Sequence, residues 1–286
     1  MGASKPAAPG INTDNYLTIE ALEDGMTVSL SVNACEYCID GSGDWVALPA
    51  ATATPAVNTG QTLSFKATGL TPTSSAGIGT FSISKKCNLK GNCMSMVYGD
   101  EAEGQTTISK SNQFRLLFRE CTNVVKVSSD FLPATNMKSN SYLLMFDGCT
   151  SLTTAPELPA TTLANACYHG MFYNCSSLIA APALPAMTLA TSCYSSMFYG
   201  CTSLTTAPEL PATELKTACY YWMFCGCERL VYIKAMFLTL PDTTYIENWV
   251  AYVPATGTFV KNAAATWDVT GVSGIPEGWT VEVAES

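Results

Sequence analysis

The segment Met145-Phe146-Asp147-Gly148-Cys149 is the first of four similar segments that decide the fold of this chain. The other three are Met171-Phe172-Tyr173-Asn174-Cys175, Met197-Phe198-Tyr199-Gly200-Cys201 and Met223-Phe224-Cys225-Gly226-Cys227, and each starts 26 residues after the one before. A unit of this size is too small to close a hydrophobic core by itself. We therefore expect the copies to stack and to bury their apolar side chains against one another.

Other positions keep the same period, so the repeats form an alignment within one chain. A leucine follows each of these cysteines by three residues, Leu-Pro-Ala recurs from copy to copy, and a Cys-Tyr pair begins at Cys167, Cys193 and Cys219. A degenerate copy begins at Leu117 and contains two additional residues after Cys121. Positions that never change should form the core, and positions that vary should face solvent.

The spacing within one copy predicts a short helix and a short strand. Thr162 can cap a helix in which Leu163, Cys167 and Met171 recur at four-residue intervals. An extended stretch over residues 151–154 ends before a proline, so each copy would add one strand to a parallel sheet. This arrangement is an α/β leucine-rich-repeat solenoid, which we expect over residues 101–240 with about four to five repeats.

The sequences on either side of the repeats have a different character. Residues 15–100 predict an all-β, sandwich-like domain, because short β-rich segments alternate with turn residues. These segments are Tyr16–Glu20, Met26–Val32, Trp45–Leu48, Gln61–Ala67 and Gly79–Ser84. We expect a flexible segment at residues 1–14 and a C-terminal cap at residues 241–286, where the repeat pattern ends. The predicted fold class is therefore mixed.

Seven of the thirteen cysteines keep the repeat period. Parallel strands stack about 4.8 Å apart, so the cysteines of one repeat position should form a ladder. One ladder would contain Cys149, Cys175, Cys201 and Cys227, and the other Cys167, Cys193 and Cys219. Side chains that point in the same direction cannot easily reach the dihedral angle of a disulfide. We therefore predict buried, reduced thiols that act as small apolar groups.

Charge and hydropathy exclude two classes of partner. Charged residues make up 13% of the chain and the net charge is -9, so no basic surface for nucleic acid can be assembled. No apolar run approaches the roughly 18 residues that a membrane-spanning helix needs, which predicts no membrane insertion. Residues 1–14 lack the hydrophobic centre of a signal peptide.

Candidate catalytic groups are few, because the chain has a single histidine. His169 follows Cys167 by two residues, and on a helix these side chains would point too far apart to act as base and nucleophile. Glu157 and Glu209 occupy the same repeat position two copies apart, which is broadly the separation of an inverting glycosidase pair. Solvated loop carboxylates are the favoured interpretation, so we predict no catalytic residue and no enzymatic activity.

The sequence also contains two candidate metal sites, and the support for both is weak. A zinc site of four thiolates would need Cys35, Cys38, Cys87 and Cys93, for which core thiols or one local disulfide are the favoured interpretation. The glycine-rich turn at residues 40–45 contains two aspartates but lacks the remaining ligands of a calcium loop. We predict no metal site and no cofactor.

The repeated frame, Met-Phe-x-x-Cys-x-x-Leu followed by Leu-Pro, resembles the BspA-like leucine-rich repeat proteins of bacterial surfaces. The resemblance extends from Cys121 to about Leu240, a little under half of the chain. Thr, Ala and Pro replace the isoleucine-rich strand of that family, and Met-Phe replaces Ala-Phe. The resemblance implies a non-enzymatic adhesion or recognition module, in some members associated with bacteriophage particles, and it names no ligand.

The variable positions of the repeats supply the candidate binding surface. Only four residues between Cys149 and Gly226 are charged, so the exterior is polar, neutral and rich in aromatic side chains. The surface candidates are His169, Tyr173, Tyr199, Tyr221 and Trp222. Exposed Tyr and Trp are favoured in recognition because they offer a large rigid area and a polar tip. The alternative is that these rings only pack sideways on neighbouring repeats.

These observations lead to two functional hypotheses. The first is a recognition or adhesion protein that is extracellular or at the cell surface, displayed on a bacterium or a particle, and binds a protein or glycan through the repeat faces. The second is a structural or receptor-binding component of a bacteriophage virion that forms a homo-oligomer. Oligomeric mass distinguishes the two.

Overall fold

The structure is a computed structural model that describes residues 10–284. A flexible segment was predicted for residues 1–14, of which residues 1–9 lie outside the described part of the chain. Thr13–Asn15 form a short 3-10 helix, η1. The next part of the chain forms seven strands: β1 (Leu17–Ala21), β2 (Val28–Leu30), β3 (Cys35–Ile39), β4 (Val46–Leu48), β5 (Thr62–Lys66), β6 (Phe81–Ile83) and β7 (Cys87–Lys90). Strands β3 and β7 lie outside the segments predicted from the sequence, whereas the other five lie within or overlap them.

The first sheet joins the N-terminal region to the repeats. Its strand order is β4-β3-β5-β1-β7-β8, where β8 (Val124–Val127) comes from the degenerate first repeat, and β2 pairs with β6 in a separate two-stranded sheet. Strand β1 is antiparallel to β5 and β7, whereas β7 and β8 are parallel. Phe65 and Phe81, one from each sheet, pack with their ring centroids 5.2 Å apart. The hydrophobic core of this region therefore lies between the two sheets.

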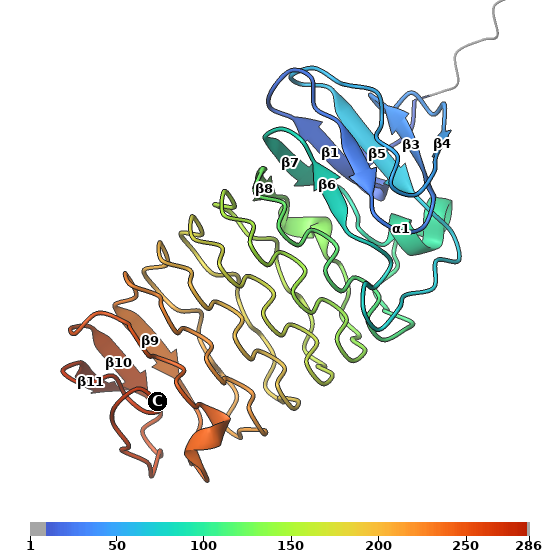
Figure 1. Ribbon diagram of the computed structural model, residues 1–286. Helices are drawn as coiled ribbons and strands as arrows, with labels where there is room; N and C mark the ends of the chain where they lie inside the picture. Colours follow the sequence, from blue (N-terminus) through green and yellow to red (C-terminus); the bar gives the residue numbers. More distant parts are fainter. Residues whose placement is uncertain (1–9, 285–286) are drawn as a thin grey trace, which may run out of the picture.

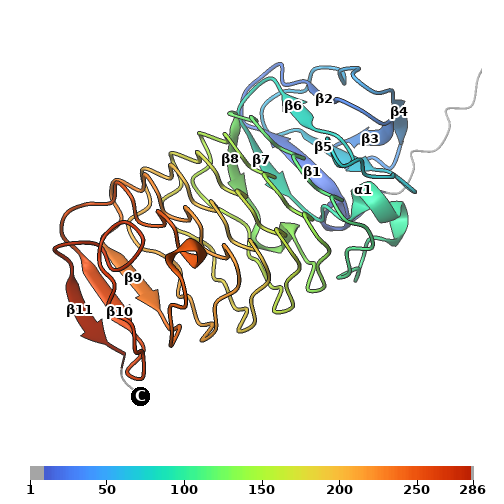
Figure 2. The ribbon, with the colours of Figure 1, turned by 60° about the horizontal axis from the view of Figure 1, so that its bottom comes forward.

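Between β7 and residue 132 the chain forms one α-helix, α1 (Ser95–Tyr98), and the 3-10 helices η2 (Gly99–Glu101) and η3 (Ser129–Phe131). From residue 132 to residue 231 the described chain forms no helix and no strand. Figures 1 and 2 show this part as successive coils that lie side by side, from the N-terminal sheets to the C-terminal end.

The prediction of an α/β leucine-rich-repeat solenoid is wrong. Residues 165–174, where a helix capped by Thr162 was expected, form a continuous run of turns. The predicted strand at residues 151–154 is reduced to single parallel bridges, from Thr154 to Lys126 and to Ala180. The mixed fold class therefore has to be replaced by a fold of strands and irregular coils with one short α-helix among the described residues.

The backbone hydrogen bonds of one coil explain why no helix forms. Cys167, His169, Met171 and Tyr173 donate their N–H groups to the carbonyl oxygen three residues earlier. The residues between them, Tyr168, Gly170, Phe172 and Asn174, donate to the carbonyl oxygen 25 residues later, at 2.7–3.0 Å. An α-helix needs every N–H for its own i-4 carbonyl. Every second N–H is instead used to join one coil to the next.

A left-handed residue at every fourth position maintains this alternation. In one coil the residues with positive φ are Ala166 (52°), Gly170 (58°) and Asn174 (56°). Cys167, Met171 and Cys175 each follow such a residue, and all three are buried. The apolar period is thus four residues, which is close enough to the helical period of 3.6 to resemble it over two turns.

Two aromatic ladders fill the core of the coils, and we call them the inner ladders. The phenylalanine ladder contains Phe118, Phe146, Phe172, Phe198 and Phe224, with centroids 5.6–5.8 Å apart and planes within 9° of parallel. The tyrosine ladder contains Tyr142, Tyr168, Tyr194 and Tyr220, with centroids 5.8–6.1 Å apart. All of these side chains are buried, as expected for invariant repeat positions.

Both inner ladders continue beyond the clear repeats. Phe118 stacks on Phe81 of β6 at 5.3 Å, so the N-terminal region covers the first coil. At the other end the rings of Tyr220 and Phe224 both meet Trp249, whose Nε1 donates to the carbonyl oxygen of Gly274 at 2.8 Å. Trp249 therefore ends both ladders.

The C-terminal region adds further layers to the stack of coils. Strands β9 (Tyr232–Ala235), β10 (Thr258–Lys261) and β11 (Thr280–Val283) form a parallel three-stranded sheet, and η4 (Thr243–Tyr245) lies between β9 and β10. The partner of Tyr232 is Thr258, so the period of 26 residues persists from β9 to β10. Strand β11 has a partner on one edge only among the described residues.

Candidate functional site

Four of the five predicted surface residues come together in the structure. Tyr173 and Tyr199 stack with centroids 4.4 Å apart and planes 2° from parallel. Trp222 stacks on Tyr199 at 5.7 Å, and Tyr221 lies 5.9 Å from Trp222. We call these four side chains the aromatic ridge. They come from three successive coils and are half-buried.

The ridge combines the two interpretations that the sequence left open. The rings pack sideways on neighbouring repeats, so the ring faces between Tyr173, Tyr199 and Trp222 are occupied by one another. The four residues remain partly exposed, although Trp222 Nε1 is shielded from water. The ridge is therefore suited to contacts through ring edges and hydroxyl groups, and less to stacking a flat ligand on a ring face.

The backbone fixes the rings of the ridge in place. The N–H of Asn174 donates to the carbonyl oxygen of Tyr199 at 2.7 Å, and the N–H of Ser196 donates to that of Tyr221 at 2.7 Å. Trp222 has a positive φ of 54°, at the repeat position that Gly170 and Ser196 occupy in the preceding coils. A preorganised surface loses little conformational entropy when it binds a ligand.

The pKa of Tyr173 also reflects this packing. Burial raises the pKa of its hydroxyl, and the neighbouring Tyr199 raises it further. Tyr173 therefore presents a neutral hydroxyl group, which can both donate and accept hydrogen bonds.

His169 lies outside the ridge. It is half-buried, its side chain makes no hydrogen bond within residues 10–284, and no aromatic contact joins it to the four rings. Burial lowers its pKa, and the positive charge of Arg115 lowers it further. His169 is therefore neutral near pH 7.

The candidates for chemistry stay apart from one another. Glu157 and Glu209 are both exposed, and Glu209 pairs with Lys234 at 3.0 Å. Asp40, in the glycine-rich turn, accepts hydrogen bonds from Gln61 and from the backbone of Thr62. Within residues 10–284 no three His, Cys, Asp or Glu side chains converge as metal ligands.

The cysteines of the two predicted ladders are all buried, and none forms a disulfide. In the first ladder Cys149, Cys175, Cys201 and Cys227 each donate a thiol hydrogen bond to a phenylalanine carbonyl of the preceding coil, at 3.1–3.2 Å. In the second ladder burial raises the pKa of Cys167 to about 12 and that of Cys219 to about 11, and it also raises the pKa of Cys193. Thiolates, the reactive form, are therefore disfavoured at both ladders.

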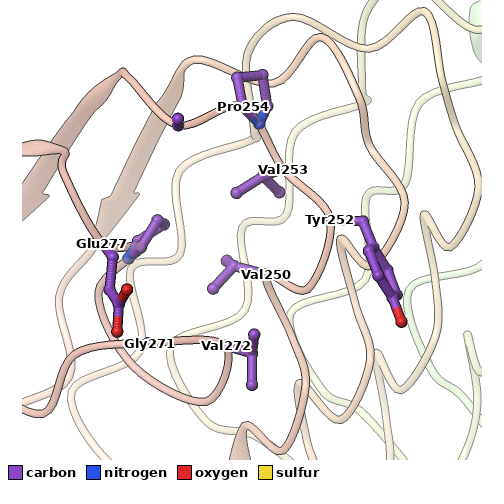
Figure 3. A pocket seen from close by; sticks show the side chains of 9 residues that line it. Val250, Tyr252, Val253, Pro254, Gly271, Val272 and Glu277 are labelled. Carbon is purple, nitrogen blue, oxygen red and sulfur yellow. The ribbon is translucent and has the colours of Figure 1, made fainter.

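An apolar pocket opens at the C-terminal end of the stack, with a volume of about 310 Å³. Figure 3 shows the side chains of Val250, Val253 and Val272 at its centre and Glu277 at one side. Tyr252, which also lines the pocket, is 80% exposed. The sequence analysis treated this region only as a cap and did not single out these residues.

Comparison with known proteins gives no further guide, because no protein-family model, curated protein or solved structure matches the chain. None of the helices in residues 10–284 has the length and apolar character needed to cross a lipid bilayer. A functional proposal therefore depends on the surfaces described above.

Proposed function

We propose that the protein is a non-enzymatic recognition or adhesion module, displayed on a bacterial surface or particle, that binds a protein or glycan through the faces of its stacked coils. The aromatic ridge is the observation that supports this most directly. Its rings lie at repeat positions that vary, so the fold does not require them. They stack on one another, and the residues remain partly exposed.

The chemistry of the repeats agrees with this proposal. Between Cys149 and Gly226 the four charged residues are Glu157, Glu209, Glu214 and Lys216. A neutral surface of this kind favours contacts made by aromatic groups and hydrogen bonds over electrostatic attraction. The repeat frame that resembles the BspA-like proteins indicates the same class of function.

The test is a binding screen with two matched variants. Labelled protein is applied to arrays of glycans and extracellular-matrix proteins, and the strongest signal is titrated. The ridge variant combines Tyr173→Ser, Tyr199→Ser and Trp222→Ser. The control variant combines Ile179→Ser and Met187→Ser, two apolar side chains that are 58% and 60% exposed and lie outside the ridge. Thermal unfolding of each variant shows that the fold is retained.

We expect the ridge variant to lose at least tenfold in affinity and the control variant to change little, because central aromatic side chains carry most binding energy. Equal affinities for the wild type and the ridge variant would exclude the ridge as the contact surface. A screen without any saturable ligand would contradict the recognition function itself.

A virion component that forms a homo-oligomer is the second candidate. The C-terminal end of the stack supports it, because β11 has a strand partner on one edge only within residues 10–284, and its Val281 and Val283 are 46% and 58% exposed. Unpaired edge strands with apolar side chains are prone to pair with another chain. Light scattering that gives a stable trimer or a larger closed ring would favour this candidate, and a monomer would count against it.

A further inference from the structure

The apolar pocket at the C-terminal end of the stack, which we call the valine pocket, has walls that a ligand can reach (Figure 3). Val272 is 51% exposed and Tyr252 is 80% exposed, while Val253 and Pro254 are half-buried. Val250, which is buried, lies at the bottom. The volume of about 310 Å³ is within the range of small-molecule sites. An aliphatic group therefore has side-chain surface to contact here.

Tyr252 occupies a repeat position at which a large side chain is costly. The equivalent residues of the four clear copies are Gly148, Asn174, Gly200 and Gly226. All five residues have a positive φ, which is 63° at Tyr252. Glycine and asparagine adopt this conformation most easily, so a tyrosine costs backbone free energy. Because Tyr252 is largely exposed, its burial returns little of that cost, and the ring is available to a ligand.

Glu277 places an uncompensated negative charge at one side of the valine pocket. A Cβ atom on Gly271 would lie 3.8 Å from Oε1 of Glu277, so the carboxylate lies beside backbone that lines the pocket. Glu277 is exposed and forms no ion pair with any of residues 10–284. Lys261, the only basic residue between residues 241 and 284, donates instead to the carbonyl oxygen of Trp267 at 3.2 Å. The carboxylate can therefore pair with a ligand.

The region around the pocket is acidic as well. Against the single basic residue, residues 241–284 contain five acidic ones, which are Asp242, Glu247, Asp268, Glu277 and Glu282. None of these five forms an ion pair within the described part of the chain. The local field therefore attracts a cation and repels an anion.

We propose that the valine pocket binds the side chain of a lysine on a partner protein. The ammonium group of that lysine pairs with Glu277, and its methylene stem lies on Val253, Pro254 and Val272. The ring of Tyr252 contacts the partner's backbone beside the same lysine. Lysine suits the pocket because it carries a compact charge on an apolar four-carbon stem. The inference goes beyond the proposed function, because no residue of the aromatic ridge lines this pocket.

The lining favours lysine over other organic cations. A quaternary ammonium group is typically held in a cage of aromatic rings, and Tyr252 is the only aromatic residue that lines this pocket. A guanidinium group typically combines a bidentate carboxylate pair with stacking on an aromatic face. Figure 3 shows Glu277 and Tyr252 on opposite sides of the valines, so one guanidinium group does not engage both. An ammonium group needs only the carboxylate.

The experiment follows the valine methyl signals of the full chain by NMR during titration with small probes. The main probe is Nα-acetyl-lysine N-methylamide, and the norleucine analogue keeps the apolar stem without the charge. The arginine analogue and choline represent the other organic cations. Glu277→Gln removes the carboxylate charge at nearly constant volume. Glu282→Gln is the matched control, since Glu282 is also an exposed glutamate of this region but lies outside the pocket.

We expect the lysine probe to shift the methyl signals of Val253 and Val272 in a saturable manner. It should bind about tenfold more tightly than the norleucine probe, as a charge-assisted hydrogen bond predicts. Glu277→Gln should remove this difference, and Glu282→Gln should bind like the wild type. Tyr252→Gly, which introduces the residue of the other copies, should weaken lysine binding without lowering the midpoint of thermal unfolding.

Several results would overturn the proposal. These are no saturable shift of the valine signals, equal binding of the lysine and norleucine probes, equal losses for the two glutamate variants, and tighter binding of the arginine probe or of choline. A lower unfolding midpoint for Tyr252→Gly would mean that the ring serves the fold. The ridge variant separates this proposal from the proposed function, because it should bind the lysine probe normally even if it has lost the ligand found in the array screen.

Discussion

The inner ladders and the aromatic ridge are both stacks of aromatic rings on successive coils, but they differ in what fixes them. The inner phenylalanine rings are 5.6–5.8 Å apart at every step and are buried. In the ridge the ring centroids of Tyr173 and Tyr199 are 4.4 Å apart, and the equivalent residue of the next repeat is Cys225.

The difference shows which aromatic residues the fold needs. A buried ring in each coil is required because every layer must fill the same volume. At the repeat position of Tyr173 and Tyr199 other copies have Asp147 and Cys225, so the repeat does not require an aromatic ring there. The rings at this position are therefore not required to fill the interior, and this observation supports the proposed recognition function.

The largest expected effect is a loss of stability when one ring is removed from each stack. Phe172→Ala should destabilise the fold by about 3–5 kcal/mol, the usual cost of a large cavity. Tyr173→Ala, the adjacent residue, should cost no more than about 1 kcal/mol, because its ring is half-exposed. Urea unfolding followed by circular dichroism measures both. Similar losses for the two variants would mean that the ridge is part of the core.

A second test uses the hydroxyl groups of the two kinds of tyrosine. The hydroxyl oxygen of Tyr168 in the inner ladder is shielded from water and has no hydrogen-bond partner. Tyr168→Phe should therefore stabilise the fold by about 1 kcal/mol, since it removes an unsatisfied polar group. Tyr173→Phe in the ridge should change the unfolding free energy by less than about 0.5 kcal/mol. A destabilised Tyr168→Phe variant would show that the inner hydroxyl has a partner in solution.

A third and smaller effect concerns the residues with positive φ, which occur in the coils that carry both stacks. Ala166 has a φ of 52°, a conformation that an alanine adopts at a cost of about 1–2 kcal/mol. Ala166→Gly should relieve this cost and stabilise the protein by about 0.5–1 kcal/mol, after the greater freedom of glycine in the unfolded chain is subtracted. Ala160→Gly, at a buried position outside the left-handed set, should destabilise by about 1 kcal/mol. Thermal unfolding compares the two variants.

The residues with positive φ also show how much of the fold could be predicted from the sequence. The 26-residue period and the buried positions follow from the repeats alone, because the copies can be compared within one chain. The helix prediction failed because cysteine and methionine recur every four residues in both geometries. Glycine or asparagine at Gly148, Gly170, Asn174, Gly200 and Gly226 indicated left-handed turns. Leucine and tryptophan at the equivalent positions Leu144 and Trp222 obscured that signal.

The aromatic ridge and the six-stranded sheet differ in the same respect. The ridge could be predicted in outline, since variable aromatic positions of successive repeats must lie close together. The junction of that sheet with the repeats could not, because it depends on the pairing of β7 with β8 across a register shift. No local pattern records that pairing, and β7 itself lies outside the predicted strands.

The smallest expected effect is a change in the pH dependence of protein stability, which involves His169. His169 is the only ionisable group of the predicted surface whose pKa is lowered, by burial first and by Arg115 second. Its neutral form is therefore favoured in the folded protein, and its contribution to stability is complete above about pH 6.5, the ordinary pKa of histidine. That contribution is lost as the pH falls through the lowered folded-state value.

His169→Gln should consequently lose less stability than the wild type between pH 7 and pH 5, when unfolding by urea is measured at each pH. Tyr173→Phe provides the control, because burial raises the pKa of this tyrosine hydroxyl further above the range. Its pH profile should run parallel to that of the wild type. Parallel profiles for His169→Gln and the wild type would instead place the histidine in contact with water.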